Sequence, residues 1–371
     1  MSAHQRVLRR APMALALAAV ACVGERATGP NHADGFDAAR AGADARAMQN
    51  VLGAAALESF AVLSERFDLT SAPSAAVAAS RDVLAAGDAS SPLEAKRLAV
   101  AVAGRVLNGA RGATPAARAI RPESLGKTFV YDPALRRYVV APDRAGAPAD
   151  GVRFILYAVN PVTRQPIVDR EIGYADLHDE GAARASGIAL RLVVVSEETT
   201  FLDYAVTVDA GPGSGALSIV GFLTDGVTRL NFRIDAHGAA SAGSATLDVA
   251  FEFAIPERGF AASAHVQGAT TEAGHVEHVD LVVHSGAATI AFDVVSDGQT
   301  VNATILVNGQ LFATVTGDAS HPDVRGAGGR PLTPDEVDAL TQFMHIAGGV
   351  FELFGNLLKP VDAVLRMASS V

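Results

Sequence analysis

Apolar and polar residues alternate with a period of two over most of the stretch from Lys127 to Asp318. The clearest runs place the following apolar residues at every second position: Leu202, Tyr204, Val206 and Val208; Leu230, Phe232 and Ile234; Leu247, Val249, Phe251, Phe253 and Ile255; Ile290, Phe292 and Val294. This period is typical of strands with one apolar and one hydrated face. Strands of an all-parallel sheet are buried on both faces and would form continuous apolar runs instead. The pattern therefore predicts a one-faced antiparallel β-sheet.

Turn residues separate these runs at intervals of about ten residues. Asp225-Gly226, Asp297-Gly298 and Asn308-Gly309 are pairs that favour tight hairpin turns. The spacing predicts an up-and-down meander of roughly ten or more strands over residues 126–320. Such a sheet cannot leave its apolar face in water, so we expect a large curved sheet or an open barrel whose apolar side is shielded.

The spacing of apolar residues changes to three or four before the sheet, within residues 47–125. One amphipathic helix is predicted by Met48, Leu52, Ala56, Phe60, Leu63 and Phe67. Further helices are predicted around residues 74–86 and 91–109, the latter with Pro92 at its first position. We therefore expect an N-terminal helical segment in front of the sheet.

A second helical pattern follows the sheet, within residues 321–371. Thr333-Pro334-Asp335-Glu336 combines an N-cap, a proline at the first helical position and a glutamate at the capping-box position. Apolar residues then recur at helical spacing: Leu340, Phe343, Met344, Ala347, Phe351, Phe354 and Leu358. The prediction is an α+β fold in which a linker leads to a C-terminal helix packed on the apolar face of the sheet.

The first 21 residues have the three-part layout of a signal peptide. Arg6, Arg9 and Arg10 form a cationic head, and the uncharged apolar run from Ala11 to Ala21 follows it. That run is shorter than the roughly 20 residues that a membrane-spanning helix needs. We expect residues 1–21 to be removed, and the polar, aperiodic residues 22–46 to form a flexible tether.

The end of the apolar run reads Leu17-Ala18-Ala19-Val20-Ala21-Cys22, which resembles the lipobox of bacterial lipoproteins. The resemblance implies that Cys22 becomes a lipidated N-terminus, and Val23 after it implies the outer membrane of the cell envelope. Ala19 departs from the usual leucine, and an ordinary secreted protein cut at an Ala-x-Ala site is the alternative. Cys22 is the only cysteine, so the chain can form no intramolecular disulfide.

Two segments of the body, residues 151–159 and 308–312, resemble predicted lipoproteins of GC-rich bacteria. That resemblance implies an address but no activity. The full chain has 30 Lys and Arg against 40 Asp and Glu, a formal net charge of −10. This charge disfavours nucleic acid and anionic membrane surfaces as partners, because both would repel it. The only membrane contact we expect is through the lipid anchor.

Motifs for the common enzyme classes are missing from the sequence. It contains no HExxH, no GxSxG elbow, no P-loop and no GxGxxG that opens a helix. We therefore assign no catalytic residues and no cofactor, and an enzyme is the least favoured of three functional hypotheses.

Histidines are concentrated in one predicted hairpin. His278 and His284 share the polar face of one strand, and His265 shares the polar face of the strand before it. A hairpin centred between Thr271 and Glu272 would place His265 opposite His278, at a Cβ separation of about 4.5–5.5 Å. Two imidazoles at that separation, with a carboxylate nearby, could hold Zn²⁺. The alternative is that these histidines are ordinary polar residues of a hydrated face.

The favoured functional hypothesis is a carrier of an apolar ligand held between the sheet and the C-terminal helix. This arrangement resembles the architecture of periplasmic lipoprotein carriers. The residues expected to face the ligand are Phe232, Phe251, Phe253, Phe292, Phe343, Phe351 and Phe354. The alternative is a structural module of the envelope that has a fully packed core and binds a protein or polysaccharide.

Overall fold

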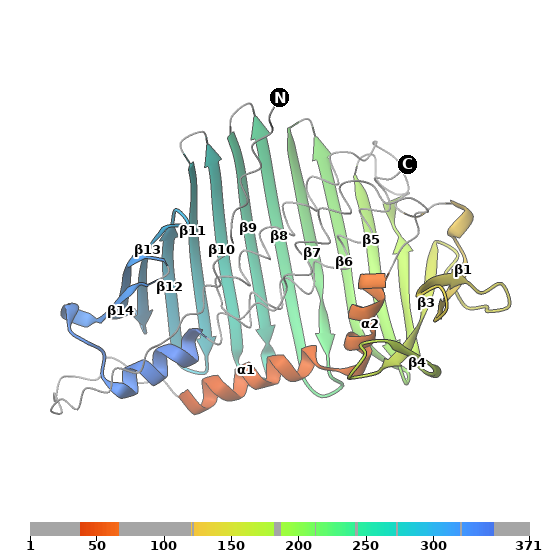
Figure 1. The fold of residues 1–371 in the computed structure, drawn as a ribbon, viewed down its shortest axis with the longest axis horizontal. Coiled ribbons are helices and arrows are strands. Elements are labelled where there is room, and N and C mark those ends of the chain that lie inside the picture. The colour runs from red at the N-terminus through yellow and green to blue at the C-terminus, as the bar shows by residue number, and fades with distance from the viewer. Residues whose placement is uncertain are drawn as a thin grey trace, which may run out of the picture.

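A computed structural model describes residues 38–66, 120, 122–181, 187–211, 213–241, 244–271, 274–319 and 321–344. Its main feature is a single sheet of 15 strands (Figure 1). The strands are β1 (Lys127–Asp132), β2 (Arg137–Val140), β3 (Gly151–Val159), β4 (Pro166–Asp179), β5 (Ile188–Ser196), β6 (Thr199–Gly211), β7 (Ser214–Thr224), β8 (Arg229–Ser241), β9 (Ser244–Ile255), β10 (Phe260–Thr271), β11 (Gly274–Ser285), β12 (Ala288–Ser296), β13 (Thr300–Val307), β14 (Gln310–Asp318) and β15 (Asp323–Gly326). The described helices are α1 (Ala38–Leu52) and α2 (Ala55–Arg66), with short 3₁₀ turns η1 (Pro122–Ser124), η3 (Pro256–Arg258) and η4 (Ala327–Gly329). Residues 334–344 are also helical.

The predicted antiparallel meander is confirmed from β3 to β15, where every strand pairs with the next one in the chain. The sheet is mixed rather than purely antiparallel, because β1 pairs in parallel with β3 and antiparallel with β2. This exception arises because β1 and β2 form a hairpin, and β3 then joins it on the side of β1. The sheet does not close into a complete barrel, because β15 and β2 lie at opposite ends of the strand order.

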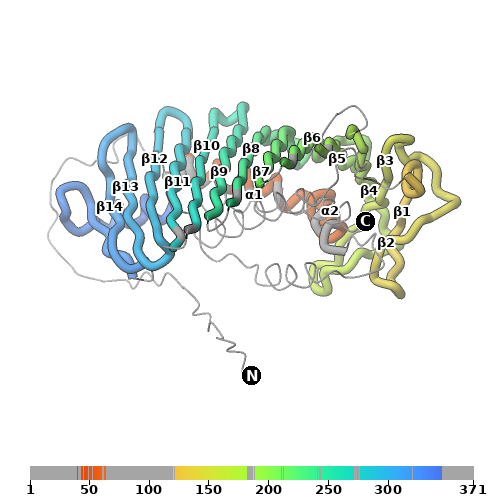
Figure 2. Tube along the Cα trace, turned by 90° about the horizontal axis from the view of Figure 1, so that it is seen from above, coloured from red at the N-terminus to blue at the C-terminus, as the bar shows by residue number. Residues whose placement is uncertain are grey.

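The two faces of the sheet differ as the alternation predicted. In β7, for example, Leu217, Ile219 and Leu223 are buried, whereas Val220 between them is exposed. The sheet curves strongly, and α1 and α2 lie on its concave side (Figure 2). The buried apolar residues of nearly all strands join one core cluster with Met48, Val51 and Phe60 from these helices. The apolar face is therefore the concave face, and the hydrated face is convex.

A glycine allows two aromatic rings to meet on the concave face. Gly221 of β7 lies between Tyr204 of β6 and Phe232 of β8 in the strand register. A Cβ at Gly221 would lie 2.3 Å from the Asp203 carbonyl oxygen and 2.3 Å from the Tyr204 Cβ. With no Cβ there, the rings of Tyr204 and Phe232 approach edge to face, with centroids 6.0 Å apart. This small residue thus fixes the packing of three strands.

The hairpin turns differ in how well their residues suit them. Asn308 and Gly309 have φ values of 51° and 77°, the left-handed pair that a tight hairpin turn requires. Glu197 and Glu198 adopt φ values of 47° and 65° in the β5–β6 turn, without a glycine or asparagine to relieve the strain. The β5–β6 turn is therefore a local weak point.

The sheet extends beyond its predicted end. Residues 323–326 form β15, which pairs with β14, whereas the sequence predicts a linker there. The Gly- and Pro-rich surroundings suggested irregular structure, and a four-residue edge strand shows too little alternation to be recognised.

Helix α1 corrects the predicted tether, since residues 38–46 are helical. Four residues at helical spacing are buried along one side of α1: Asp44, Ala47, Met48 and Val51. The apolar pattern missed the first turns because a carboxylate and a small alanine stand where large apolar residues were sought. Gly53 separates α1 from α2, so the single helix predicted from Met48 to Phe67 is divided in two.

The predicted capping box at the start of the C-terminal helix is confirmed. The Thr333 amide donates to Glu336 Oε2 at 2.9 Å, and the Glu336 amide donates to Thr333 Oγ1 at 3.3 Å. Phe343 is fully buried and joins the core cluster.

Several predictions fall outside the described residues. These are the signal peptide, Cys22, the helices expected at 74–86 and 91–109, and the C-terminal helix beyond residue 344, with Phe351 and Phe354. None of the described helices combines the length and the apolar character needed to span a membrane.

Candidate functional site

The concave face of the sheet carries four of the seven phenylalanines that were predicted to face a ligand. Phe232, Phe251, Phe253 and Phe292 point to this side of β8, β9 and β12, and all are at most 6% exposed. Phe251 and Phe253 contact each other with ring centroids 5.5 Å apart. Burial of the Tyr204 phenol on the same face raises its pKa, so this hydroxyl stays neutral. The surface is therefore apolar and uncharged over this region.

An aromatic cluster joins the helical segment 334–344 to the sheet. Phe343 packs edge to face against Phe292 of β12 and Phe312 of β14, with centroid distances of 6.4 and 5.4 Å. Phe312 was not predicted to lie on the apolar face. Its neighbour Leu311 is apolar but exposed, and the β13–β14 register shifts between Ile305 and Leu306, so simple alternation does not show which of the two side chains is buried. Phe343 thus fixes this segment at the β12–β14 end of the apolar face.

Helix α1 is attached to the rim of the sheet by a buried carboxylate. Asp44, 1% exposed, accepts hydrogen bonds from Arg258 Nε and from the Ser285 hydroxyl, both at 2.7 Å. Arg258 belongs to the turn between β9 and β10, and Ser285 ends β11. Arg40 also donates to the Arg258 carbonyl oxygen at 2.7 Å. Polar contacts at one edge of the sheet therefore position the helix that crosses its lower end (Figure 1).

The segment 334–344 has a similar polar attachment. The Arg330 guanidinium donates to both carboxylate oxygens of Glu336, at 2.7 and 2.5 Å. The hydrogen bonds from Arg330 hold the pKa of the Glu336 carboxyl below its usual range. The carboxylate is thus charged at neutral pH and joins the capping box to the preceding loop.

The histidine pair predicted for Zn²⁺ is not formed. In the β10–β11 hairpin His265 lies opposite Asp280, and His278 lies opposite Gln267. The turn is centred one residue later than predicted, so every cross-strand partner changes by two residues while each side chain keeps its face. The predicted metal set of His265, His278 and His284 is therefore wrong as a set.

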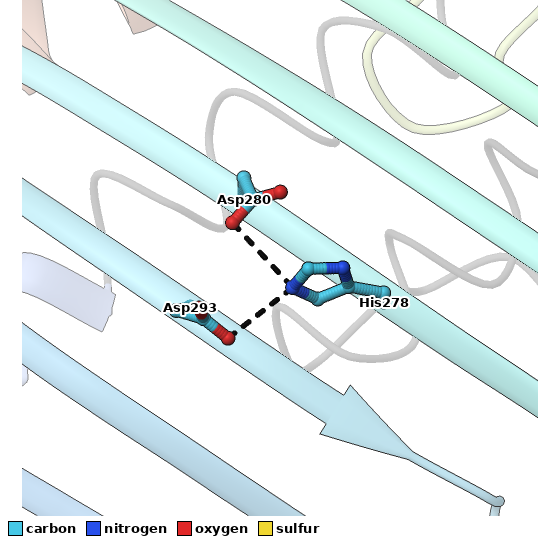
Figure 3. Close-up of side chains that lie close together, drawn as sticks. All are labelled: His278, Asp280 and Asp293. Atoms are coloured by element: carbon cyan, nitrogen blue, oxygen red, sulfur yellow. Dashed lines mark hydrogen bonds and ion pairs between the residues drawn. The ribbon is translucent and has the colours of Figure 1, made fainter.

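His278 instead meets two carboxylates (Figure 3). Its Nε2 lies 3.2 Å from Asp293 Oδ1 on β12 and 3.5 Å from Asp280 Oδ1 on its own strand. One ligand atom from each residue can be chosen so that all three lie within 4.8 Å of one another. We call His278, Asp280 and Asp293 the His–Asp–Asp cluster. Two adjacent strands of the hydrated face position it.

The other two histidines have separate partners. His265 Nε2 lies 2.9 Å from Asp248 Oδ1 on β9. Although burial opposes the shift, hydrogen bonds from His265 and Gln267 lower the pKa of Asp248. His284 Nδ1 lies 3.0 Å from Thr289 Oγ1. Neither histidine belongs to the His–Asp–Asp cluster.

A shallow depression of about 480 Å³ lies near the β6–β9 hairpin ends. Small residues such as Gly211, Ser214 and Ala239 line it, together with Asp209, Asp248 and His237. Its lining comes mainly from the hydrated face, so it is separate from the apolar face.

Comparison with protein-family models, curated proteins and solved structures found no match for this chain.

Proposed function

We propose that the chain is a non-enzymatic lipoprotein of the bacterial cell envelope that binds an apolar, lipid-like molecule between the concave face of its sheet and its C-terminal helical region. The observation that carries this proposal is the continuous apolar face of one open sheet, lined by Phe232, Phe251, Phe253 and Phe292. Apolar ligands bind mainly through burial of surface in such concave sites.

The way in which the helices are attached supports the proposal. The backbone hydrogen bonds that hold the sheet together run between its strands and do not involve the described helices. Asp44 attaches α1 at the rim of the sheet, and the Arg330–Glu336 pair joins the segment 334–344 to the preceding loop. A helix held in this way can shift without breaking the backbone hydrogen bonds of the sheet. A ligand could therefore enter from the side of the helices.

The lipobox-like sequence ending at Cys22 supplies the proposed address. A lipid on Cys22 would tether the protein to a membrane, and the outer membrane is the proposed destination. Replacing the cysteine in Cys22→Ser should move the protein from the membrane fraction to the soluble fraction and remove the mass of the acyl chains. An unchanged membrane fraction and mass would contradict the anchor while leaving the ligand proposal intact.

Uptake of N-phenyl-1-naphthylamine, which fluoresces in apolar surroundings, tests the ligand proposal. Purified mature protein should show saturable uptake of the probe. Phe251→Ala should raise the dissociation constant of the probe by about fivefold or more, equivalent to roughly 1 kcal/mol of binding free energy. Phe222→Ala is the matched control, because Phe222 lies on the opposite face beneath the Arg229 guanidinium. Circular dichroism checks that both variants fold. Absence of saturable uptake by the wild-type protein would contradict the proposal.

A structural module with a packed core is the second candidate. It is favoured by the complete burial of Phe343 against Phe292 and Phe312, which leaves no ligand surface on that ring. In this case the hydrated face, with its depression between β6 and β9, would bind an envelope protein or polysaccharide. A protein that takes up no apolar probe but binds an envelope component through this face would support the second candidate.

A further inference from the structure

We propose that His278, Asp280 and Asp293 bind a divalent transition-metal ion, with Zn²⁺ as the representative, on the hydrated face of the sheet. This inference is independent of the apolar ligand, because the cluster lies on the face opposite the phenylalanines.

The spacing of the three side chains fits a metal ion. Zn²⁺ is bound at about 2.0–2.2 Å by histidine nitrogen and carboxylate oxygen. Two ligands at those distances from a tetrahedral ion are separated by roughly 3.3–3.5 Å. His278 Nε2 lies 3.2 Å from Asp293 Oδ1 and 3.5 Å from Asp280 Oδ1. The two nitrogen–oxygen distances are thus already near those of an occupied site, and all three ligand atoms lie within 4.8 Å of one another.

The charges around the cluster also call for a cation. Asp280 and Asp293 are directly opposite each other in the strand register, where like charges destabilise a sheet. The outer cross-strand neighbours are His265 beside Asp280 and Thr304 beside Asp293. The cross-strand neighbours of His278 are Gln267 and Val295. None of these positions carries a lysine or arginine, so no permanent positive charge balances the carboxylates there.

The orientation of the imidazole also favours a cation that contacts all three side chains. The same ring nitrogen, Nε2, faces both carboxylates (Figure 3). If the proton of a neutral ring lay on Nδ1, the lone pair of Nε2 would face two negative oxygens, which is unfavourable without a cation between them. A proton on Nε2 meets this need in part, and can form one good hydrogen bond at a time. A divalent ion interacts with all three atoms at once and balances both carboxylate charges.

The exposure of the cluster leaves room for further ligands. The side chains of His278, Asp280 and Asp293 are 36, 47 and 63% exposed. Water can therefore complete the coordination, as in sites with three protein ligands. Both strands are paired on each side in the 15-stranded sheet, so the ligands need little rearrangement on binding.

Calorimetric titration of the full chain with Zn²⁺ at neutral pH tests the proposal. The expected result is one equivalent of Zn²⁺ that is lost in His278→Gln and in Asp293→Asn. Its affinity should fall by more than the roughly 10–100-fold that removal of an outer-shell partner costs. Co²⁺ in place of Zn²⁺ should give visible absorption that both variants lose.

His265→Gln is the matched control. His265 lies on the same face and directly opposite Asp280, but its Nε2 lies 2.9 Å from Asp248 Oδ1 and is not part of the His–Asp–Asp cluster. This variant should bind Zn²⁺ like the wild-type protein. Circular dichroism checks that all three variants fold. The proposal is overturned if the wild-type chain binds no Zn²⁺, if His278→Gln and Asp293→Asn keep the equivalent, or if His265→Gln loses it to the same extent.

Discussion

Replacing Asp44 should release helix α1 from the sheet. In Asp44→Ala, the carboxylate that accepts hydrogen bonds from Arg258 and Ser285 is lost. A hydrogen bond to a charged group contributes about 1.5–3 kcal/mol, and an unsatisfied buried hydroxyl costs about 1–3 kcal/mol. The Ser285 residue is only 5% exposed and would be left without this acceptor. Arg258 is 35% exposed, so water can replace part of its lost interaction.

The net loss expected from these terms is about 2–4 kcal/mol in the free energy of unfolding, after discounting the Arg258 contact and the desolvation of Asp44 itself. Urea denaturation followed by circular dichroism measures this loss. Hydrogen exchange of residues 38–52 measures whether it is local to α1. Exchange there should accelerate in Asp44→Ala more than exchange in the central strands β8–β10.

Asp323→Ala provides the comparison for Asp44. Asp323 pairs with Arg325 on β15, but their side chains are 57 and 46% exposed. Removing such a surface pair should cost about 0–1 kcal/mol. If Asp44→Ala is no more destabilising than Asp323→Ala, or if exchange in residues 38–52 is unchanged, the buried carboxylate does not hold α1 to the rim.

Four further predictions concern stability. Because Arg330 lowers the folded-state pKa of Glu336, this carboxylate stabilises the fold above its unfolded pKa and loses that effect as the pH falls through the lowered value. Glu336→Gln should therefore lower the melting temperature at pH 7, and the melting temperatures of variant and wild type should converge in acid. A constant difference across a pH series would contradict this. Phe343→Ala should cost about 3–5 kcal/mol in urea denaturation, because the ring is fully buried between Phe292 and Phe312; a loss below about 1 kcal/mol would mean that the aromatic cluster is not formed. Gly221→Ala should lower the melting temperature by several degrees, because the added Cβ would clash with strand β6. Gly211→Ala should change the melting temperature little, because its Cβ would meet only the Ser214 hydroxyl at 3.4 Å, and equal effects would argue against the close approach at Gly221. Glu198→Gly should stabilise the protein by about 1 kcal/mol in the same denaturation experiment, because φ of 65° is unfavourable for glutamate; destabilisation would show that the turn is not strained as described.

The faces of the strands could be predicted from the sequence, but several of their partners could not. Side chains alternate strictly along a strand, so the period of two was enough to place Phe251 and Phe253 on the buried face. The partner of His278 depends on the centre of the β10–β11 turn, and a one-residue error there changed its neighbour from His265 to Gln267. Correct faces with incorrect partners are the expected result of reading periodicity alone.

Other features depend on contacts between distant parts of the chain. The parallel pairing of β1 with β3 follows from how a hairpin joins the sheet, and no local signal records it. Asp44 occupies a buried helix position because Arg258 and Ser285 lie beside it, over 200 residues later in the chain. Asp293 of the His–Asp–Asp cluster lies on a strand that the histidine pattern did not include.

Native mass spectrometry of the protein, purified gently from the cells that produce it, is the decisive test of the proposed apolar ligand. We expect a species heavier than the polypeptide, including any acyl chains on Cys22, by the mass of a bound apolar molecule that can be extracted with an organic solvent and identified. A spectrum without this heavier species, together with an extract that contains no apolar molecule, would contradict the proposed binding function.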